Sequence, residues 1–138
     1  MKANTTQLLN DLCKTKDIKA FLDEKDGEFL TISLCELLNE LAARYDMSVA
    51  EVARRSGQGE YVYKVFQGKR NPSRDILFAV AIGMGATLGE TQMLLRVAKL
   101  AAPDPRDKRD SVMIYGINEK LSIDALNELL YELQEKTL

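Results

Sequence analysis

Basic side chains are concentrated between residues 48 and 74, where they could hold a phosphate-bearing partner. Two carboxylates, Glu51 and Glu60, accompany six positive side chains in this stretch: Arg54, Arg55, Lys64, Lys69, Arg70 and Arg74. The stretch therefore carries a net charge of +4, and the rest of the chain carries −6, because the total is −2. A basic patch on an acidic body is typical of a protein with one surface facing phosphates and the others facing solvent.

Two kinds of nucleic-acid contact are available in this stretch. Cations and amides can bind backbone phosphates, and these candidates are Arg54, Arg55, Lys69, Arg70, Asn71 and Arg74. Other side chains can read base edges, and these candidates are Glu60, Tyr61, Tyr63, Lys64 and Gln67. Lys64 can donate to guanine, Gln67 can pair with adenine, and Glu60 can accept from cytosine. The two tyrosines can donate hydroxyls to phosphates or lay a ring on a thymine methyl.

Other kinds of chemistry find little support in the sequence. The chain has no histidine, and its two cysteines, Cys13 and Cys35, stand alone without a CxxC spacing. This composition excludes zinc sites of the usual ligand types and histidine acid–base catalysis, and we interpret both thiols as small packing residues. No P-loop, glycine-rich dinucleotide turn or serine elbow is present. We expect no enzyme activity, no cofactor and no metal.

Length and composition favour one folded unit. The chain has 138 residues, of which 46% are hydrophobic and 29% charged, enough for one sizeable core and a small accessory subdomain. No apolar run approaches the roughly 18 to 20 residues that cross a bilayer, and the N-terminal segment lacks the apolar region of a signal peptide. We therefore expect a cytoplasmic protein without a membrane partner.

Capping patterns predict the helices that position the basic stretch. Ser33 with Glu36 and Ser48 with Glu51 have the spacing of a capping box, so each pair marks a helix start. The first helix should end near residue 45, and the second should cover about 48–56. A glycine-bearing break follows, before a third helix over about 59–67. Two short helices joined by such a turn predict a helix-turn-helix.

Two further helices should complete the central unit. Gly68 closes the third helix, residues 69–72 form a basic loop, and Ser73 caps a fourth helix. Thr87 with Glu90 repeats the capping-box spacing and starts a fifth helix that runs to about Leu100. If the third helix buries Val62, Val65 and Phe66, its outer face carries the base-reading candidates.

The flanking segments are also expected to be helical. Residues 1–30 predict two short helices and a break at Asp26-Gly27, and we interpret them as an N-terminal extension, because their many acidic residues argue against a DNA-contacting arm. Residues 101–110 predict a charged loop, which we interpret as a solvated linker, with a second phosphate contact as the alternative. Two helices should follow, from about 111 to 118 and from 122 to 135.

A weak internal repeat links the central unit with the C-terminal segment. Residues 87–95 align with residues 122–130 at an offset of 35, with a hydroxyl cap, an early acid and a Leu-Leu pair in both. This pattern fits two stacked helical hairpins, and it also fits ordinary helix signals that coincide. The stripe Leu126, Leu129, Leu130 and Leu133 either forms a dimer interface or packs on its own domain.

At Val52-Ala53 and at residues 65–73, VFQGKRNPS, the sequence resembles the lambda-repressor-like (Cro/XRE) helix-turn-helix family. In that family a short third helix ends in glycine, a Gly-Lys-Arg-Asn-Pro-Ser loop follows, and an aliphatic fourth helix closes the domain. The resemblance covers about residues 33–100. One residue fewer separates Ala53 from Gly68 than in the family pattern, and a helix displaced by one residue turns by about 100°. A tighter turn must therefore restore the phase of the third helix.

The resemblance implies an all-α, lambda-repressor-like helix-turn-helix bundle of about five helices at 31–101. The flanking patterns add a short N-terminal helical extension at 1–30 and a C-terminal helical hairpin at 102–138. The resemblance also implies a sequence-specific transcriptional regulator that binds double-stranded DNA. Such a domain covers only a half-site, so we expect a homodimer. The alternative is a protein-interaction module that keeps the fold without binding DNA. The acidic isoelectric point near 5.3 and Glu60 favour this alternative, and the basic loop opposes it.

Overall fold

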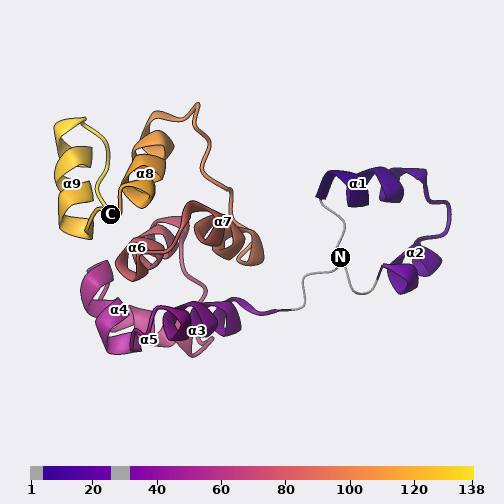
Figure 1. Cartoon of the computed structure of the whole chain (residues 1–138), viewed down its shortest axis with the longest axis horizontal. Helices are drawn as coiled ribbons and strands as arrows, with labels where there is room; N and C mark the ends of the chain where they lie inside the picture. Colours follow the sequence, from indigo (N-terminus) through magenta and orange to yellow (C-terminus); the bar gives the residue numbers. More distant parts are fainter. Residues whose placement is uncertain (1–4, 26–31) are drawn as a thin grey trace. The chain divides into compact units, whose positions relative to one another are not determined.

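The computed structural model describes residues 5–25 and 32–138, which contain nine helices and no strand (Figure 1). The expected all-α class is therefore confirmed for the described residues. The chain divides into two compact units, Met1–Thr31 and Ile32–Leu138. The predicted break at Asp26-Gly27 lies outside the described residues.

The first unit contains the two short helices that the sequence predicts, α1 (Thr5–Lys14) and α2 (Ile18–Glu24). The Asp17 carboxylate caps α2 by accepting from the Ala20 amide at 3.2 Å. Phe21 is buried. Four other large apolar side chains of this unit are exposed: Leu9, Leu12, Ile18 and Leu22.

The second unit contains seven helices within its described residues: α3 (Leu34–Arg44), α4 (Val49–Ser56), α5 (Tyr61–Phe66), α6 (Arg74–Met84), α7 (Leu88–Val97), α8 (Lys108–Asn118) and α9 (Ile123–Glu132). Hydroxyl caps begin five of them, as predicted, because each side chain accepts from the amide three residues later. Only Thr87 and Glu90 form the reciprocal capping box among these caps. At α4 the Glu51 carboxylate binds arginines instead.

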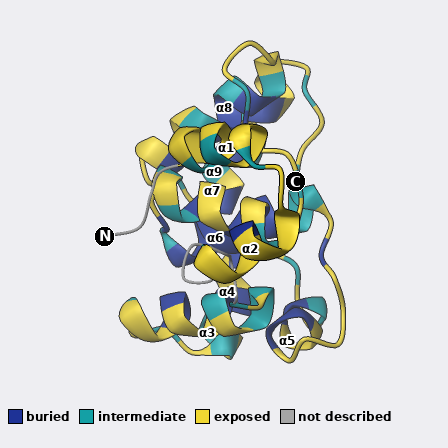
Figure 2. Cartoon of the chain, turned by 90° about the vertical axis from the view of Figure 1, so that its right-hand side faces the viewer, coloured by how far each residue is buried: buried dark blue, intermediate teal, exposed yellow. Residues whose placement is uncertain are grey.

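The core is organised around α6, which lies between α4 and the C-terminal hairpin α8–α9 (Figures 1 and 2). All residues of α6 from Leu77 to Met84 are buried. The hairpin contributes to the same hydrophobic cluster, in which Leu126 and Leu130 are fully buried. The predicted leucine stripe of α9 therefore packs largely on its own unit, although Leu133 stays exposed.

The C-terminal hairpin begins earlier than the sequence predicts. Helix α8 starts at Lys108 rather than near residue 111, with Asp107 as its cap. The interpretation of 101–110 as a solvated linker is therefore wrong for its last three residues. Asp110 in particular is buried.

The weak sequence repeat corresponds to a repeated hairpin. Helices α7 and α9 begin and end at positions that differ by 35 residues, and their caps, Thr87 and Ser122, differ by the same offset. The residues with left-handed φ that follow the helices also recur at this offset. Gly85 (φ 72°) corresponds to Lys120 (φ 56°), and Lys99 (φ 60°) corresponds to Gln134 (φ 61°). The hairpins α6–α7 and α8–α9 therefore share one plan.

Helices α4 and α6 touch through their backbones. A Cβ atom placed on Gly83 would lie 2.9 Å from the Ser56 amide nitrogen and 3.1 Å from its Cα. Ser56 is itself fully buried, and its hydroxyl donates to the Ala53 carbonyl at 3.1 Å. Gly83 thus sets how closely the last turn of α4 approaches the central helix.

We predict that Gly83→Ala lowers the free energy of unfolding by about 2 kcal/mol, because the added methyl group overlaps backbone that cannot rotate away. Urea unfolding of the full chain measures this loss. Gly89→Ala is the matched control, since the nearest atom to its Cβ would be the Thr87 hydroxyl at 3.9 Å. Gly89→Ala should raise the free energy of unfolding by about 0.5 kcal/mol, because alanine is a better helix former than glycine. Equal effects of the two substitutions would contradict the close-contact account.

Candidate nucleic-acid interface

The turn between α4 and α5 restores the helix phase through two left-handed glycines. Gly57 has φ 72° and Gly59 has φ 63°, conformations that glycine adopts without steric cost. The Val62 amide donates to the Gly59 carbonyl at 3.2 Å, which starts α5 directly after the turn. As predicted, Val62 and Phe66 are buried together with Val65, none more than 5% exposed. The turn therefore leaves Val62, Val65 and Phe66 on the buried face of α5.

Four of the five base-reading candidates lie on one exposed stripe. Glu60, Tyr63, Lys64 and Gln67 are exposed, and their spacing of three and four residues places them on one side of α5. We call this stripe the recognition face. Tyr61 differs, because its ring is half-buried and its hydroxyl donates to the Asn71 carbonyl at 3.2 Å. The structure thus gives Tyr61 a partner in the following loop.

The basic loop, defined as Lys69, Arg70 and Asn71, follows a well-determined helix end. Gly68 has φ 75°, its amide donates to Val65, and the Lys69 amide donates to the Lys64 carbonyl at 2.9 Å. These bonds form a Schellman motif, which fixes the direction in which the chain leaves α5. All three loop residues are exposed, while Pro72 behind them is buried.

Asn39 on α3 secures the same helix end, a role that the sequence analysis missed. Its amide donates to the Phe66 carbonyl at 3.0 Å and to the Cys35 carbonyl of its own helix at 2.7 Å. A carbonyl at a helix end lacks an intrahelical partner, so this bond satisfies it. The sequence signal for this role is weak, because Asn39 is simply a polar residue that follows Leu38 in a leucine-rich helix.

Within the basic stretch, residues 48–74, the cations without an ion-pair partner lie on the recognition face and the basic loop. Within residues 5–25 and 32–138, Lys64, Lys69 and Arg70 have no ion-pair partner. Arg54 and Arg55 share one oxygen of Glu51, at 2.6 and 2.7 Å. These hydrogen bonds lower the pKa of the Glu51 carboxyl and keep it ionised.

Arg74, another predicted phosphate contact, is held inside the unit. Its guanidinium binds both oxygens of Asp110 at 2.8 Å and donates to the Ala101 and Ala102 carbonyls at 2.9 and 3.2 Å. It also lies 4.9 Å from the centre of the Phe78 ring. With these partners Arg74 is poorly placed to bind a phosphate, and it joins α6 to α8 instead.

Arg74 belongs to a reciprocal pair of bridges. Asp75 binds Arg109 through two bonds of 2.8 and 3.2 Å, so neighbouring residues of α6 pair crosswise with neighbouring residues of α8. We call these four residues the Arg–Asp clasp. Asp110 is only 6% exposed and also accepts from the Asp104 amide at 3.0 Å. The Arg74 guanidinium lowers the pKa of the Asp110 carboxyl below its ordinary value, although burial opposes this shift.

Comparison of the chain with protein-family models, with curated proteins and with solved structures finds no match. The described residues contain no group of three or more metal-ligating side chains suited to a metal ion. None of the helices described is long and apolar enough to cross a membrane. The arrangement of the charges therefore carries the functional argument.

We predict that Asp110→Asn lowers the free energy of unfolding by about 2 kcal/mol at pH 6, because Arg74 loses its charged partner. The folded-state pKa of Asp110 is depressed, so its contribution is complete above the unfolded value of about 3.9 and disappears as pH falls through the folded value. Urea unfolding between pH 6 and pH 2 should therefore show a shallower acid loss in the variant than in the wild type.

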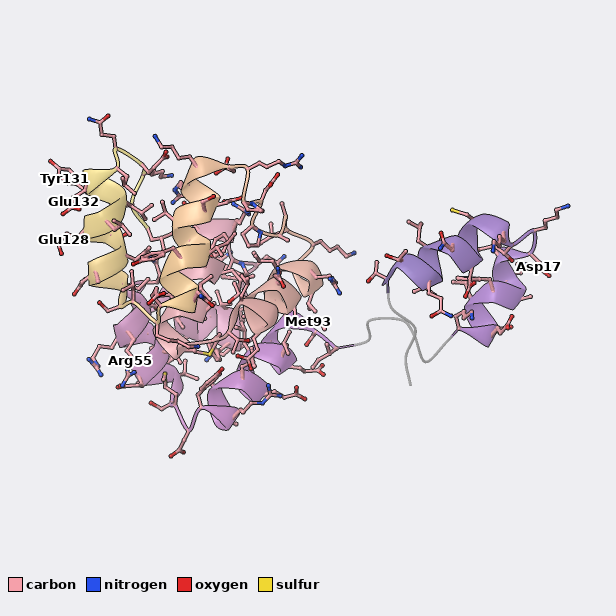
Figure 3. The ribbon with its side chains drawn as sticks, turned by 45° about the horizontal axis from the view of Figure 1, so that its top comes forward. Asp17, Arg55, Met93, Glu128, Tyr131 and Glu132 are labelled. Carbon is pink, nitrogen blue, oxygen red and sulfur yellow. The ribbon has the colours of Figure 1, made fainter. Side chains whose placement is uncertain are left out.

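Glu128→Gln is the control for this experiment, because it also converts a carboxyl group into an amide. Glu128 lies on the outer side of α9 (Figure 3), is exposed and has no ion-pair partner among the described residues. Its substitution should change stability by less than about 0.5 kcal/mol. An Asp110→Asn variant with the stability and pH profile of the control would show that the clasp contributes nothing.

Proposed function

We propose that this protein is a sequence-specific DNA-binding transcriptional regulator whose second unit contains a lambda-repressor-like helix-turn-helix formed by α4 and α5. The observation that carries the proposal is the continuity of the recognition face with the basic loop. Three cations without ion-pair partners, Lys64, Lys69 and Arg70, accompany exposed side chains able to bind base edges. Contact with phosphates requires cations that are not already paired, and base reading requires exposed polar side chains along one side of a helix.

In this proposal the basic loop binds backbone phosphates and the recognition face enters the major groove. Lys64 donates to guanine, Gln67 pairs with adenine, Glu60 accepts from cytosine, and Tyr63 contacts a thymine methyl or a phosphate. Arg54 and Arg55, whose side chains are 69% and 52% exposed despite Glu51, extend the positive surface along α4.

Tyr61 and Arg74 act on DNA only indirectly in this proposal. The Tyr61 hydroxyl holds the backbone of the basic loop against α5 through the Asn71 carbonyl. Arg74 fixes the beginning of α6, immediately after the loop, through the Arg–Asp clasp. Both are positioning residues for the phosphate contacts.

We further propose that the protein binds DNA as a homodimer. Helix α5 contains six residues, so few of its side chains can reach base edges. A recognition helix of this kind covers a half-site, and two copies supply the affinity and specificity that one lacks. Tyr115, Tyr131 and Leu133 on the C-terminal hairpin remain exposed, at 53%, 78% and 42%. They offer apolar surface for contact between two copies.

A second candidate is a protein-interaction module without DNA binding. The exposed Tyr63 and the acidic Glu60 on the recognition face favour it, because tyrosine is enriched in protein interfaces and a carboxylate repels phosphate. The two candidates differ in one property. Only a DNA-binding protein should bind duplex DNA with an affinity that falls steeply with salt.

We predict that Arg70→Ala weakens binding to every duplex by a similar factor, about fivefold at 0.15 M salt, because one phosphate contact is lost. Lys64→Ala and Gln67→Ala should instead change which sequences are selected from a random DNA pool. Fluorescence anisotropy measures the first effect, and sequencing of the selected pool measures the second. Thermal unfolding of each variant checks that the fold is intact.

Arg106→Ala is the control for lost charge. Its side chain is 90% exposed and, among the described residues, bonds only to Asp104, which lies in the second half of the α7–α8 connection. It should leave DNA affinity and sequence preference unchanged. If Arg70→Ala had no larger effect than Arg106→Ala, the basic loop would not be the phosphate contact.

A further inference from the structure

A cavity of about 460 Å³ lies between the end of α4, the end of α6 and the turn from α8 to α9. Its volume falls within the range of roughly 300–1,000 Å³ typical of small-molecule sites. Figure 1 shows α4 and α9 near each other at one side of the second unit, and Figure 3 shows Arg55 near the lower end of α9. Three segments far apart in the sequence therefore form one hollow.

The cavity combines cations with an apolar surface. Arg54, Arg55 and Lys120 line it, together with the side chains of Ile82, Leu121 and Ile123. Asp124 is the single carboxylate among its lining residues, so these side chains carry a net charge of +2, or +1 when Glu51, which binds both arginines, is included. Sites with an apolar wall and a few polar groups bind organic molecules, and the charge here selects an anion.

The three cations keep hydrogen-bonding capacity. Arg54 uses Nη2 and Arg55 uses Nε to bind Glu51, so each guanidinium has further N–H groups. The Lys120 ammonium donates to the Gly85 carbonyl at 2.6 Å, and an ammonium carries three N–H donors. The bond to Gly85 holds the Lys120 head at the wall of the cavity. Gly85 itself leaves open space, because a Cβ atom there would meet nothing within 4 Å.

We propose that this cavity binds a small organic anion, a carboxylate or phosphate monoester that carries an apolar group. The anionic group binds Lys120 and the two arginines, and the apolar group packs on Leu121 and Ile123. Arg54, Arg55 and Gly57 belong to α4 and to its turn into α5, so the ligand contacts the helix-turn-helix directly. Binding of the anion is independent of the proposed function, whereas its effect on DNA affinity rests on that function.

Phenyl phosphate and benzoate are suitable probes, and benzyl alcohol is their neutral counterpart. Each is titrated to about 10 mM into the ¹⁵N-labelled full chain, a range that suits ligands of about ten heavy atoms. We expect the two anions to shift the backbone amides of Gly57, Gly85, Leu121 and Ile123 in a saturable way. Benzyl alcohol should bind at least about tenfold more weakly, because it lacks the charge.

Lys120→Met should weaken the binding of both anions about tenfold, because a charged donor is lost. Lys99→Met is the matched control, since Lys99 also follows a helix with left-handed φ, 60° against 56° for Lys120, and lies outside the cavity. Asp124→Asn provides a second variant that removes a repelling carboxylate from an exposed position. It should tighten binding about threefold.

Three results would overturn the proposal. The first is the absence of saturable shifts at the cavity amides. The second is an equal effect of Lys120→Met and Lys99→Met together with no effect of Asp124→Asn. The third is binding of benzyl alcohol as tight as that of the two anions, which would show that the cations of the cavity contribute nothing. Because the titration contains no DNA, the anion site can succeed or fail independently of DNA binding.

Discussion

The structure depends on the backbone contact between Gly83 of α6 and Ser56 of α4. Helix α6 is almost wholly buried, so it provides a fixed surface on which α4 rests. The two left-handed glycines then carry the chain from α4 into α5 with Val62, Val65 and Phe66 inward. The recognition face points outward as a consequence. Because Gly83 has no side chain, α4 can pack closely on α6, and this packing supports the outward orientation of the recognition face on α5.

The Arg–Asp clasp reduces the number of cations in residues 48–74 that are available to a partner. Counted along the sequence, residues 48–74 carry six cations, but Arg74 is bound to Asp110, and Arg54 and Arg55 share Glu51. The remaining cations, Lys64, Lys69 and Arg70, are adjacent to one another on α5 and the basic loop. The acidic total charge therefore does not oppose DNA binding, because a local group of available cations is sufficient to contact phosphates.

Local features of the structure could be predicted from the sequence, whereas long-range pairings could not. Hydroxyl caps, glycine turns and the buried face of α5 follow from bonds within a few residues, and these predictions were confirmed. The partners of Arg74 and Arg109 lie more than 30 residues away, so no spacing rule reveals them. The recurrence of Arg-Asp at 74–75 and 109–110, at the offset of the internal repeat, was the available signal. The cavity likewise depends on three distant segments, and family membership stays a prediction.

The central claim is that the recognition face and the basic loop bind DNA phosphates and bases, and the salt dependence of duplex binding tests it most directly. Each neutralised phosphate contributes about −0.9 to the slope of log K against log salt concentration. With Lys69 and Arg70 each neutralising one phosphate, the account predicts a slope of about −2 for one protomer and about −4 for a dimer. A slope near zero, or no binding at about 50 mM salt, would contradict it.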